Sequence, residues 1–319
     1  MQSAVAQIAE RGRPDAGPSR SIKRSFMDSS KLRALRNDLL FIAPGFVFFA
    51  GIVLVSFLLG IYYSFTEWNG VDAEAVWIGF DNYVEIFQGD KQAGVSAWFT
   101  TRFTVVSVVS ANLLAFGLAL SLTRALKSAN VMRTIIFLPN IIGGIILGFI
   151  WRFIFVNSFD TIGDLSGIAF FAAPWLGTAE TGFWASVIVF LWQRTGYLMV
   201  IYVAALVGIN EDLLEAARID GATSTQMLFR IVIPLTVPAI TVCIFLALSW
   251  TTKMFDVIYA LTQGGPFGST ETFAMNIYYE AFSSNNYGLG SAKAIVFFLV
   301  VGIISTAQVL ITKRWEVEQ

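Results

Sequence analysis

The sequence predicts an all-α membrane protein with six transmembrane helices. Of its 319 residues, 56% are hydrophobic and only 13% are charged, whereas soluble domains carry about 25% charged residues. The mean hydropathy is +0.68, and the apolar residues gather in six stretches, each with the roughly 20 residues that a helix needs to cross a bilayer. This composition excludes a disordered chain, a nucleic-acid-binding module and an ordinary cytosolic enzyme.

The six apolar stretches follow one another with little charge between them. They cover residues 39–65, 98–122, 132–156, 183–209, 237–261 and 292–311. Six in a row disfavour the alternative, which is a set of buried helices in a large soluble core. The first stretch is longer than the apolar region of a signal peptide (about 7–15 residues) and lacks a small-residue cleavage site, so we expect it to be retained as a helix.

Basic residues predict the orientation, because lysine and arginine favour the cytoplasmic side of a membrane. Eight of them precede the first stretch, whereas residues 66–97 hold Lys91 against six acids and residues 157–182 hold no basic residue. Basic residues return at Arg124, Lys127, Arg133, Arg218, Arg230, Lys313 and Arg314. We therefore expect both termini in the cytoplasm, with a flexible basic tail at 1–38, a transmembrane domain at 39–313 and a short tail at 314–319.

Few residues could carry enzymatic chemistry. Histidine is absent and Cys243 is the only cysteine, which excludes Ser-His or Cys-His catalysis, a disulfide within the chain and a Cys/His metal cluster. The sequence contains no G-x-x-x-x-G-K-[ST] motif to hold ATP phosphates. We predict no catalytic residue, no metal ligand and no cofactor bound by this chain.

The segment 210–234, between the fourth and fifth stretches, predicts an elbow of two helices near the membrane surface. Asn210 is a suitable N-cap and is followed by two acids in the first helical turn. Gly221 can supply the left-handed residue that ends such a helix. A second short helix can start at residue 223 or 224, before Pro234 sets the start of the fifth stretch. The elbow is either an interfacial connector or a docking site for a cytoplasmic partner.

The residues of this elbow resemble the EAA loop of ABC importer permeases. Glu215-Ala216-Ala217, then Gly221, then Ile231-Val232-Ile233-Pro234 have the family's spacing, and isoleucine in place of the usual leucine is the only departure. Further segments are similar to the carbohydrate-importing, MalF-like branch: Gly79-Phe80-Asp81-Asn82-Tyr83, Phe255-Asp256, Thr262-Gln263-Gly264-Gly265-Pro266 and Arg314-Trp315-Glu316-Val317-Glu318. The resemblance covers most of the chain from residue 39 onward.

The resemblance implies a type I ABC importer permease in a bacterial cytoplasmic membrane. The implied partners are membrane lipid, a second permease in a hetero- or pseudo-symmetric dimer, two ATPase subunits that bind ATP and Mg, and an extracytoplasmic solute-binding protein, with no nucleic acid. The elbow would enter a cleft of the ATPase and transmit its closure to the membrane helices. The residues expected to couple the two are Glu215, Ala216, Ala217, Asp220, Gly221, Ile231 and Pro234.

Ionisable side chains inside a membrane are costly and usually face a cavity or a partner. Arg194 lies near the centre of its stretch, beside Gln193, so we expect either a water-filled pathway or a structural partner on a neighbouring helix. Lys253 and Asp256 are three residues apart on the fifth stretch and could pair with each other. Arg152 lies closer to the end of its stretch, where it could reach the interface.

The resemblance implies that the substrate passes along the fourth and fifth stretches. Tyr197 matches an aromatic position that lines the sugar site of MalF-like permeases, and residues 250, 251 and 254 occupy the matching part of the next helix. Aromatic rings suit sugars because they pack against the C–H groups of a sugar ring. The predicted pathway consists of Gln193, Arg194, Tyr197, Trp250, Thr251, Lys253, Met254 and Asp256. Its two cations would also suit an acidic sugar or a sugar phosphate.

The sequence as a whole favours the permease subunit of an ATP-driven carbohydrate importer that works by alternating access. Pro139 and Gly143-Gly144 interrupt the third stretch, either as a hinge for that motion or as a site of close helix packing. An ABC permease for another or an anionic solute is the alternative within transport. A membrane enzyme would lack a base, a metal or an acid pair, and a channel or secondary carrier would leave the elbow without a role.

Overall fold

The computed structural model describes residues 41–123 and 128–314. The expected basic tail at 1–38 lies outside the described residues. The same is true of residues 124–127, which include two of the basic residues used for the orientation, and of residues 315–319.

The fold is all-α, as the sequence predicts. Six helices are long and apolar enough to cross a membrane: Phe41–Tyr63, Lys91–Leu122, Gly144–Ser166, Ala179–Val207, Ser224–Thr252 and Tyr287–Lys313. Within the described ranges, the only strands are β1 (Thr66–Glu67) and β2 (Val76–Trp77), which form a short antiparallel pair. The described residues divide into two units, with the boundary between Phe57 and Leu58. The first spanning helix carries no charged residue, and it passes through a π-helical turn at Ala50–Leu54 into α2 (Val55–Tyr63).

The second and sixth spanning helices begin earlier than the apolar stretches. α4 (Lys91–Leu122) starts seven residues before the predicted 98, because the Asp90 carboxylate accepts a hydrogen bond from the Ala93 amide at 2.8 Å and caps the helix. α14 (Tyr287–Lys313) starts before the predicted 292, where the side chain of Asn286 accepts from the Leu289 amide. The polar first turn of α4 and the glycine-rich first turn of α14 hide both helix starts from an argument based on apolar runs.

The third predicted stretch, 132–156, is not one helix. α5 (Ala129–Phe137) runs into a 3-10 turn at Leu138–Ile141, and α6 (Gly144–Phe153) then starts in a new direction. Residues 142 and 143 are extended, with ψ of 128° and 142°, which breaks the helix after Pro139. α6 continues through a π-helical turn at Ile154–Ser158 into α7 (Phe159–Ser166). The interruption expected at Pro139 and the glycines is therefore a complete break.

The fifth predicted stretch, 237–261, is wrong at both ends. α10 (Ser224–Met227), a π-helical turn at Leu228–Val232 and α11 (Ile233–Thr252) form one continuous helix, so the second helix of the elbow is not separate. Pro234 lies in the first turn of α11, directly after the wide π turn, which accommodates the missing N–H of the proline. After Thr252 the helix ends, and α12 (Asp256–Leu261) is a separate short helix.

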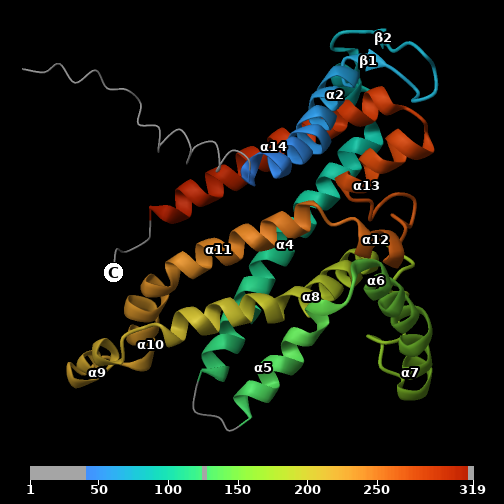
Figure 1. Ribbon diagram of the computed structural model, residues 1–319. Helices are drawn as coiled ribbons and strands as arrows, with labels where there is room; N and C mark the ends of the chain where they lie inside the picture. The colour runs from blue at the N-terminus through green and yellow to red at the C-terminus, as the bar shows by residue number, and fades with distance from the viewer. Residues whose placement is uncertain (1–40, 124–127, 315–319) are drawn as a thin grey trace, which may run out of the picture. The chain divides into compact units, whose positions relative to one another are not determined.

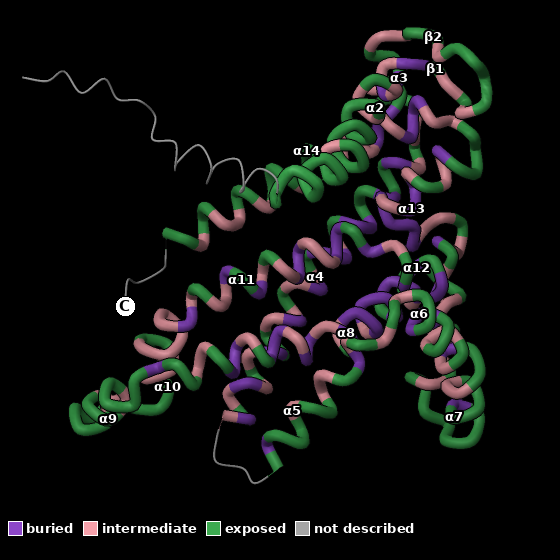
Figure 2. Tube along the Cα trace, in the orientation of Figure 1, coloured by how far each residue is buried: buried purple, intermediate pink, exposed green. Residues whose placement is uncertain are grey.

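The core lies where α8 (Ala179–Val207) packs along α4 and beside α11 (Figure 1). Ala111, Ala115 and Ala119 of α4 are fully buried at intervals of four residues, and such small side chains let membrane helices approach closely. The hydroxyl of Tyr202 donates to Asn112 Oδ1 at 2.6 Å across the same contact. Figure 2 shows the buried residues concentrated along these helices.

A buried ion cluster joins three segments next to the short helices α3 (Asp81–Gln88) and α13 (Phe273–Tyr278). The Lys293 side chain of α14 is fully buried, and its Nζ lies 2.5 Å from Asp90 Oδ2 and 2.7 Å from Glu280 Oε2. Asp90 caps α4, and Glu280 lies in the π-helical turn Tyr279–Ser283 that follows α13. The ammonium group therefore ties the start of α4 to the last membrane helix.

Candidate functional site

The elbow between α8 and α11 begins with α9 (Glu211–Ile219). The side chain of Asn210 caps α9 by accepting a hydrogen bond from the Asp212 amide at 2.9 Å. Gly221 ends the helix in the left-handed region, with φ +81°, and lets the Ala222 amide donate back to the Ala217 carbonyl at 3.0 Å. A capping box then starts the next helix at Ser224.

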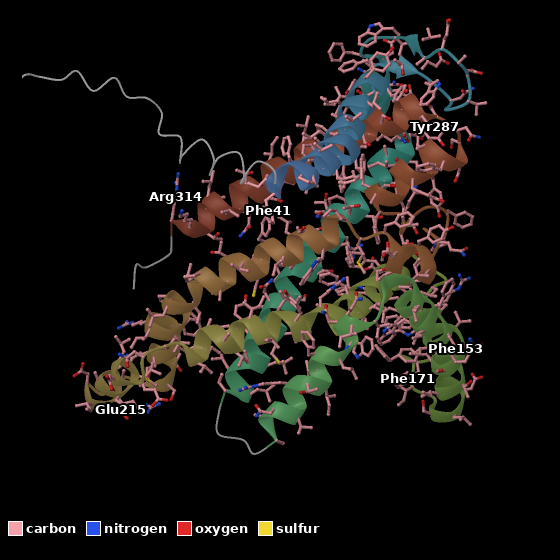
Figure 3. All side chains as sticks on the ribbon, viewed as in Figure 1. Phe41, Phe153, Phe171, Glu215, Tyr287 and Arg314 are labelled. Atoms are coloured by element: carbon pink, nitrogen blue, oxygen red, sulfur yellow. The ribbon has the colours of Figure 1, made fainter. Side chains whose placement is uncertain are left out.

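No residue of α9 or α10 is buried, and Figure 2 shows α9 mostly exposed. Ile219 is 85% exposed and Leu213 47% exposed, so the helix carries apolar side chains that the described part of the chain does not cover. Of the residues expected to couple, those exposed are Glu215, Ala216, Asp220 and Gly221, and those half-buried are Ala217, Ile231 and Pro234. Glu215 lies at the far end of the elbow in Figure 3. An exposed apolar surface of this kind is typical of a docking site.

The second candidate site is a cavity of about 190 Å³ beside the central part of α8. It lies where the break between α5 and α6 and the break between α11 and α12 meet α8. Its lining consists of Gly144, Phe190, Gln193, Arg194, Ser249, Trp250, Lys253, Met254, Phe255, Asp256 and Val257. A cavity of this volume holds about six water molecules and therefore has room for one sugar ring.

Arg194 is held on two sides. Its Nη1 donates to Asn140 Oδ1 at 2.9 Å, and its guanidinium lies 4.8 Å from the centre of the Trp250 ring. Asn140 belongs to the 3-10 turn that precedes the break in the third stretch. The structural partner expected for Arg194 is therefore present, and the side chain also lines the cavity, while the water-filled pathway stays a prediction.

Gln193 contributes a buried side chain to the wall of the cavity. The residue is only 2% exposed, and its Nε2 donates to the Ile142 carbonyl at 3.1 Å, which fixes the amide. Its Oε1 is buried and has no hydrogen-bond partner among the described residues. A buried acceptor left unpaired costs about 1–3 kcal/mol, and a ligand in the cavity can pair with this oxygen only if the lining moves to expose it.

The expected pairing of Lys253 with Asp256 is wrong. The salt bridges among the described residues do not include either side chain, because the helix ends at Thr252 and the i, i+3 spacing no longer places the two side chains together. Asp256 instead lies against the start of α6, where a Cβ on Gly144 would come within 2.9 Å of the Asp256 Cβ. The cavity thus holds two cations and one carboxylate.

Two residues of the predicted pathway do not line the cavity. Thr251 is fully buried, and its hydroxyl lies within 2.9 Å of the Ala247 carbonyl of its own helix. Tyr197 packs edge-on against Trp250, with ring centres 5.3 Å apart, and so supports the lining from behind. The other six predicted residues meet in the cavity. Sequence reasoning missed Asn140, whose only signal was its place after Pro139.

The fold and these sites define a class, that of polytopic helical membrane transport proteins with a polar cavity between broken helices. A family model narrows the class. Residues 111–317 match the family described as "Binding-protein-dependent transport system inner membrane component", and the chain belongs to that family. It is accordingly a multi-pass protein of the cytoplasmic membrane.

Similar proteins agree with this placement. The chain is 46% identical over 279 residues to "Probable starch degradation products transport system permease protein AmyD" of Thermoanaerobacterium thermosulfurigenes, covering 88% of this chain and 94% of AmyD. It is 33% identical to the multiple sugar-binding transport system permease protein MsmF of Streptococcus mutans, covering 81% and 89%. A bacterial ABC transporter involved in import of the acidic polysaccharide alginate has the same fold, with a TM-score of 0.77 at 23% identity, covering 89% and 99%.

Proposed function

We propose that this chain is the permease subunit of an importer that moves a sugar or oligosaccharide across the cytoplasmic membrane by alternating access. The observation that carries the proposal is the cavity beside α8, which is lined by the donors Arg194 and Lys253, the side chain of Gln193 and the ring of Trp250. Sugars present hydroxyl groups and apolar C–H faces, and this combination of side chains can bind both. The names of AmyD and MsmF, which refer to starch degradation products and multiple sugars, support the same substrate class.

The energy for transport would come from separate ATPase subunits, which bind ATP and Mg. The elbow of Glu215, Ala217 and Gly221 would dock on such a subunit, as the resemblance to the EAA loop implies. The elbow leads directly into the continuous helix Ser224–Thr252, and the cavity residues follow the other end of that helix. A displacement at the elbow would therefore reach the cavity through about 43 Å of helix.

The complete importer would contain a second permease, two ATPase subunits and an extracytoplasmic solute-binding protein. The family description supports dependence on a binding protein. A fold neighbour of the chain, a bacterial alginate ABC transporter, is known in complex with an alginate pentasaccharide-bound periplasmic protein. Both termini and the elbow would lie in the cytoplasm, on the side that carries most of the basic residues.

An anionic sugar or a sugar phosphate is the second candidate substrate. Arg194 and Lys253 both line the cavity, and neither is in a salt bridge with a carboxylate of the described residues. With Asp256 as the only acid, the side chains around the cavity carry a net charge of +1, which favours an anionic ligand in surroundings of low dielectric constant. The two candidates share one cavity and differ in the group that Arg194 would bind.

The test of the main proposal is the ATPase activity of the complex purified in lipid with the proteins encoded beside this chain. Binding proteins loaded from a panel of neutral and acidic sugars are added in turn. We expect co-purification of an ATPase subunit and stimulation by one sugar. If no ATPase subunit co-purifies and uptake follows an ion gradient, the proposal is wrong and the chain is a secondary carrier.

Arg194→Gln separates the two substrate classes, and Arg152→Gln is its matched control because Arg152 lies outside the cavity lining. For an anionic substrate, the loss of the cation should reduce uptake at least tenfold, because charge-assisted hydrogen bonds contribute about 1.5–3 kcal/mol. Unchanged uptake of an anionic sugar by Arg194→Gln would eliminate the second candidate.

A further inference from the structure

The loop Thr262–Thr272 connects α12 to α13, and internal hydrogen bonds hold it in shape. Thr270 is fully buried, and its hydroxyl donates to the Gly265 carbonyl at 2.6 Å while its amide donates to the Gly264 carbonyl at 3.1 Å. The Thr270 hydroxyl also lies 2.8 Å from Thr262 Oγ1. The loop therefore presents its tip in one fixed conformation.

The first turns of α4 anchor the same loop. The Glu271 carboxylate is 7% exposed and accepts from Gln92 Nε2 and Ser96 Oγ, each at 3.1 Å, and from Asn276 Nδ2 at 2.7 Å. Gln92 Nε2 also donates to the Gly268 carbonyl at 3.1 Å, at the tip itself. These buried bonds leave little freedom for the loop to fold inward.

Phe267 projects from this tip away from the rest of the described chain. Its relative exposure is 103%, the highest among the exposed large hydrophobic residues described, and its backbone is in the left-handed region at φ +51°. That conformation costs a residue with a Cβ about 1–2 kcal/mol. An exposed phenylalanine also forgoes the roughly 1.5–3 kcal/mol of its burial. Such residues persist where the surrounding structure fixes them, often at binding sites.

The partner of Phe267 must approach from the side opposite the elbow. The loop follows the far end of the continuous helix Ser224–Thr252, as Figure 1 shows for α9 and α12 at the two ends of α11. Segments predicted to lie on this far side are acidic: residues 66–97 hold six acids and one lysine, and residues 157–182 hold three acids and no basic residue. Of these acids, Asp90 is paired with Lys293 and Glu180 with Arg102, and the others form no salt bridge among the described residues. Lipid is a poor occupant of the tip, because Gln92 and Glu271 lie directly behind it.

We propose that Phe267 anchors the solute-binding protein of this importer. The ring would enter an apolar pocket on a basic face of that protein, and the acidic segments around the loop would steer the approach. A ring on a rigid loop is an effective anchor because little conformational entropy is lost when it binds. The inference rests on the proposed function, since it requires an importer that depends on an extracytoplasmic binding protein.

Phe267→Asn tests the proposal without distorting the loop, because asparagine tolerates the left-handed region. The matched control is Val71→Ala, which also truncates an exposed apolar side chain, 85% exposed, within the acidic segment 66–97. Each complex is purified in lipid nanodiscs with its partner chains. Surface plasmon resonance then measures the affinity for sugar-loaded binding proteins encoded beside this chain, at two salt concentrations. ATPase assays give basal and stimulated activity.

We expect Phe267→Asn to weaken binding at least about thirtyfold, the effect of losing an interface hot spot. Subunit composition and basal ATPase activity should stay unchanged, and added salt should weaken wild-type binding. Equal affinity of Phe267→Asn and Val71→Ala would overturn the inference and leave the proposed function standing. Loss of the second permease from the Phe267→Asn complex would overturn it in favour of a contact between permeases. If no binding protein stimulates the wild-type complex, the proposed function fails as well.

Discussion

Gly221 allows the coupling hypothesis to be tested by backbone strain alone. Its φ is +81°, and a Cβ built at this position would meet no atom within 4 Å. A substitution therefore creates no clash, and its whole cost is the left-handed conformation, about 1–2 kcal/mol for alanine, less for asparagine and more for a β-branched residue. Glycine, asparagine, alanine and valine at position 221 thus introduce increasing backbone strain into the elbow.

This strain lowers the fraction of molecules whose elbow has the geometry that can dock. At 1.4 kcal/mol per factor of ten, about 1–2 kcal/mol lowers the population of the observed geometry by roughly 5- to 30-fold if the free elbow relaxes. The apparent affinity for the ATPase subunit should fall by the same factor, because only the competent fraction binds. The assay is titration of the purified ATPase subunit against permease in nanodiscs, for each member of the series.

Gly208→Ala is the matched control, since it makes the same chemical change just before the elbow without this strain. Gly208 has φ −76°, and a Cβ there would lie 3.4 Å from the Ala204 carbonyl, an ordinary contact. We expect Gly208→Ala to bind like wild type and Gly221→Val to bind most weakly. An affinity of Gly221→Val equal to that of Gly208→Ala would refute the reasoning, because the elbow would then dock without its left-handed turn.

Three further predictions concern stability, each measured by thermal unfolding in detergent. Lys293→Met should lower the unfolding free energy by about 3–5 kcal/mol, because it leaves Asp90 and Glu280 without their cation; an unchanged melting temperature would contradict this. Burial raises the pKa of Asp90, but hydrogen bonds from Lys293 and a backbone amide outweigh it, so the pKa lies below its ordinary value. Its stabilisation is therefore fully present above about pH 4 and lost as the pH falls through the lowered pKa, and Asp90→Asn should show a smaller acid-induced decline. Gly148→Ala should cost about 1–3 kcal/mol through overpacking, because its Cβ would lie 2.6 Å from the Ala260 Cβ.

Composition and long apolar runs predicted the number of membrane-spanning helices, because a bilayer imposes length and hydrophobicity on every span. Helix ends were predicted less well. The start at Lys91 is polar and the start at Tyr287 is rich in glycine, and a capping side chain stabilises each of them. The capped start and glycine end of α9 were predictable, since these signals are local and lie in consecutive residues.

The candidate sites were predicted less completely, because they depend on contacts between residues that are far apart in the chain. The spacing of Lys253 and Asp256 suggested a pair only on the assumption that their helix continues, and the helix ends at Thr252. The partner of Arg194 is Asn140, which is 54 residues away in the chain. The cluster around Lys293 was missed for the same reason, because nothing local connects that residue to Asp90. Contacts between distant segments depend on how the helices pack, and helix packing cannot be deduced from a single sequence.

Two helix breaks create the cavity: the sequence predicts the one at Pro139 and Gly143-Gly144, and it does not predict the one after Thr252. A continuous helix satisfies its own backbone groups and presents side chains only along its faces. The breaks at residues 138–143 and 253–255 instead direct polar groups toward the middle of α8, where Arg194 and Gln193 meet them. Arg194 is bonded to the first break, and Lys253 belongs to the second. A ligand that binds both cations would therefore hold the two broken segments together, and its release would let them separate. Under the proposed function, substrate binding and the motion of the helices would depend on the same few residues.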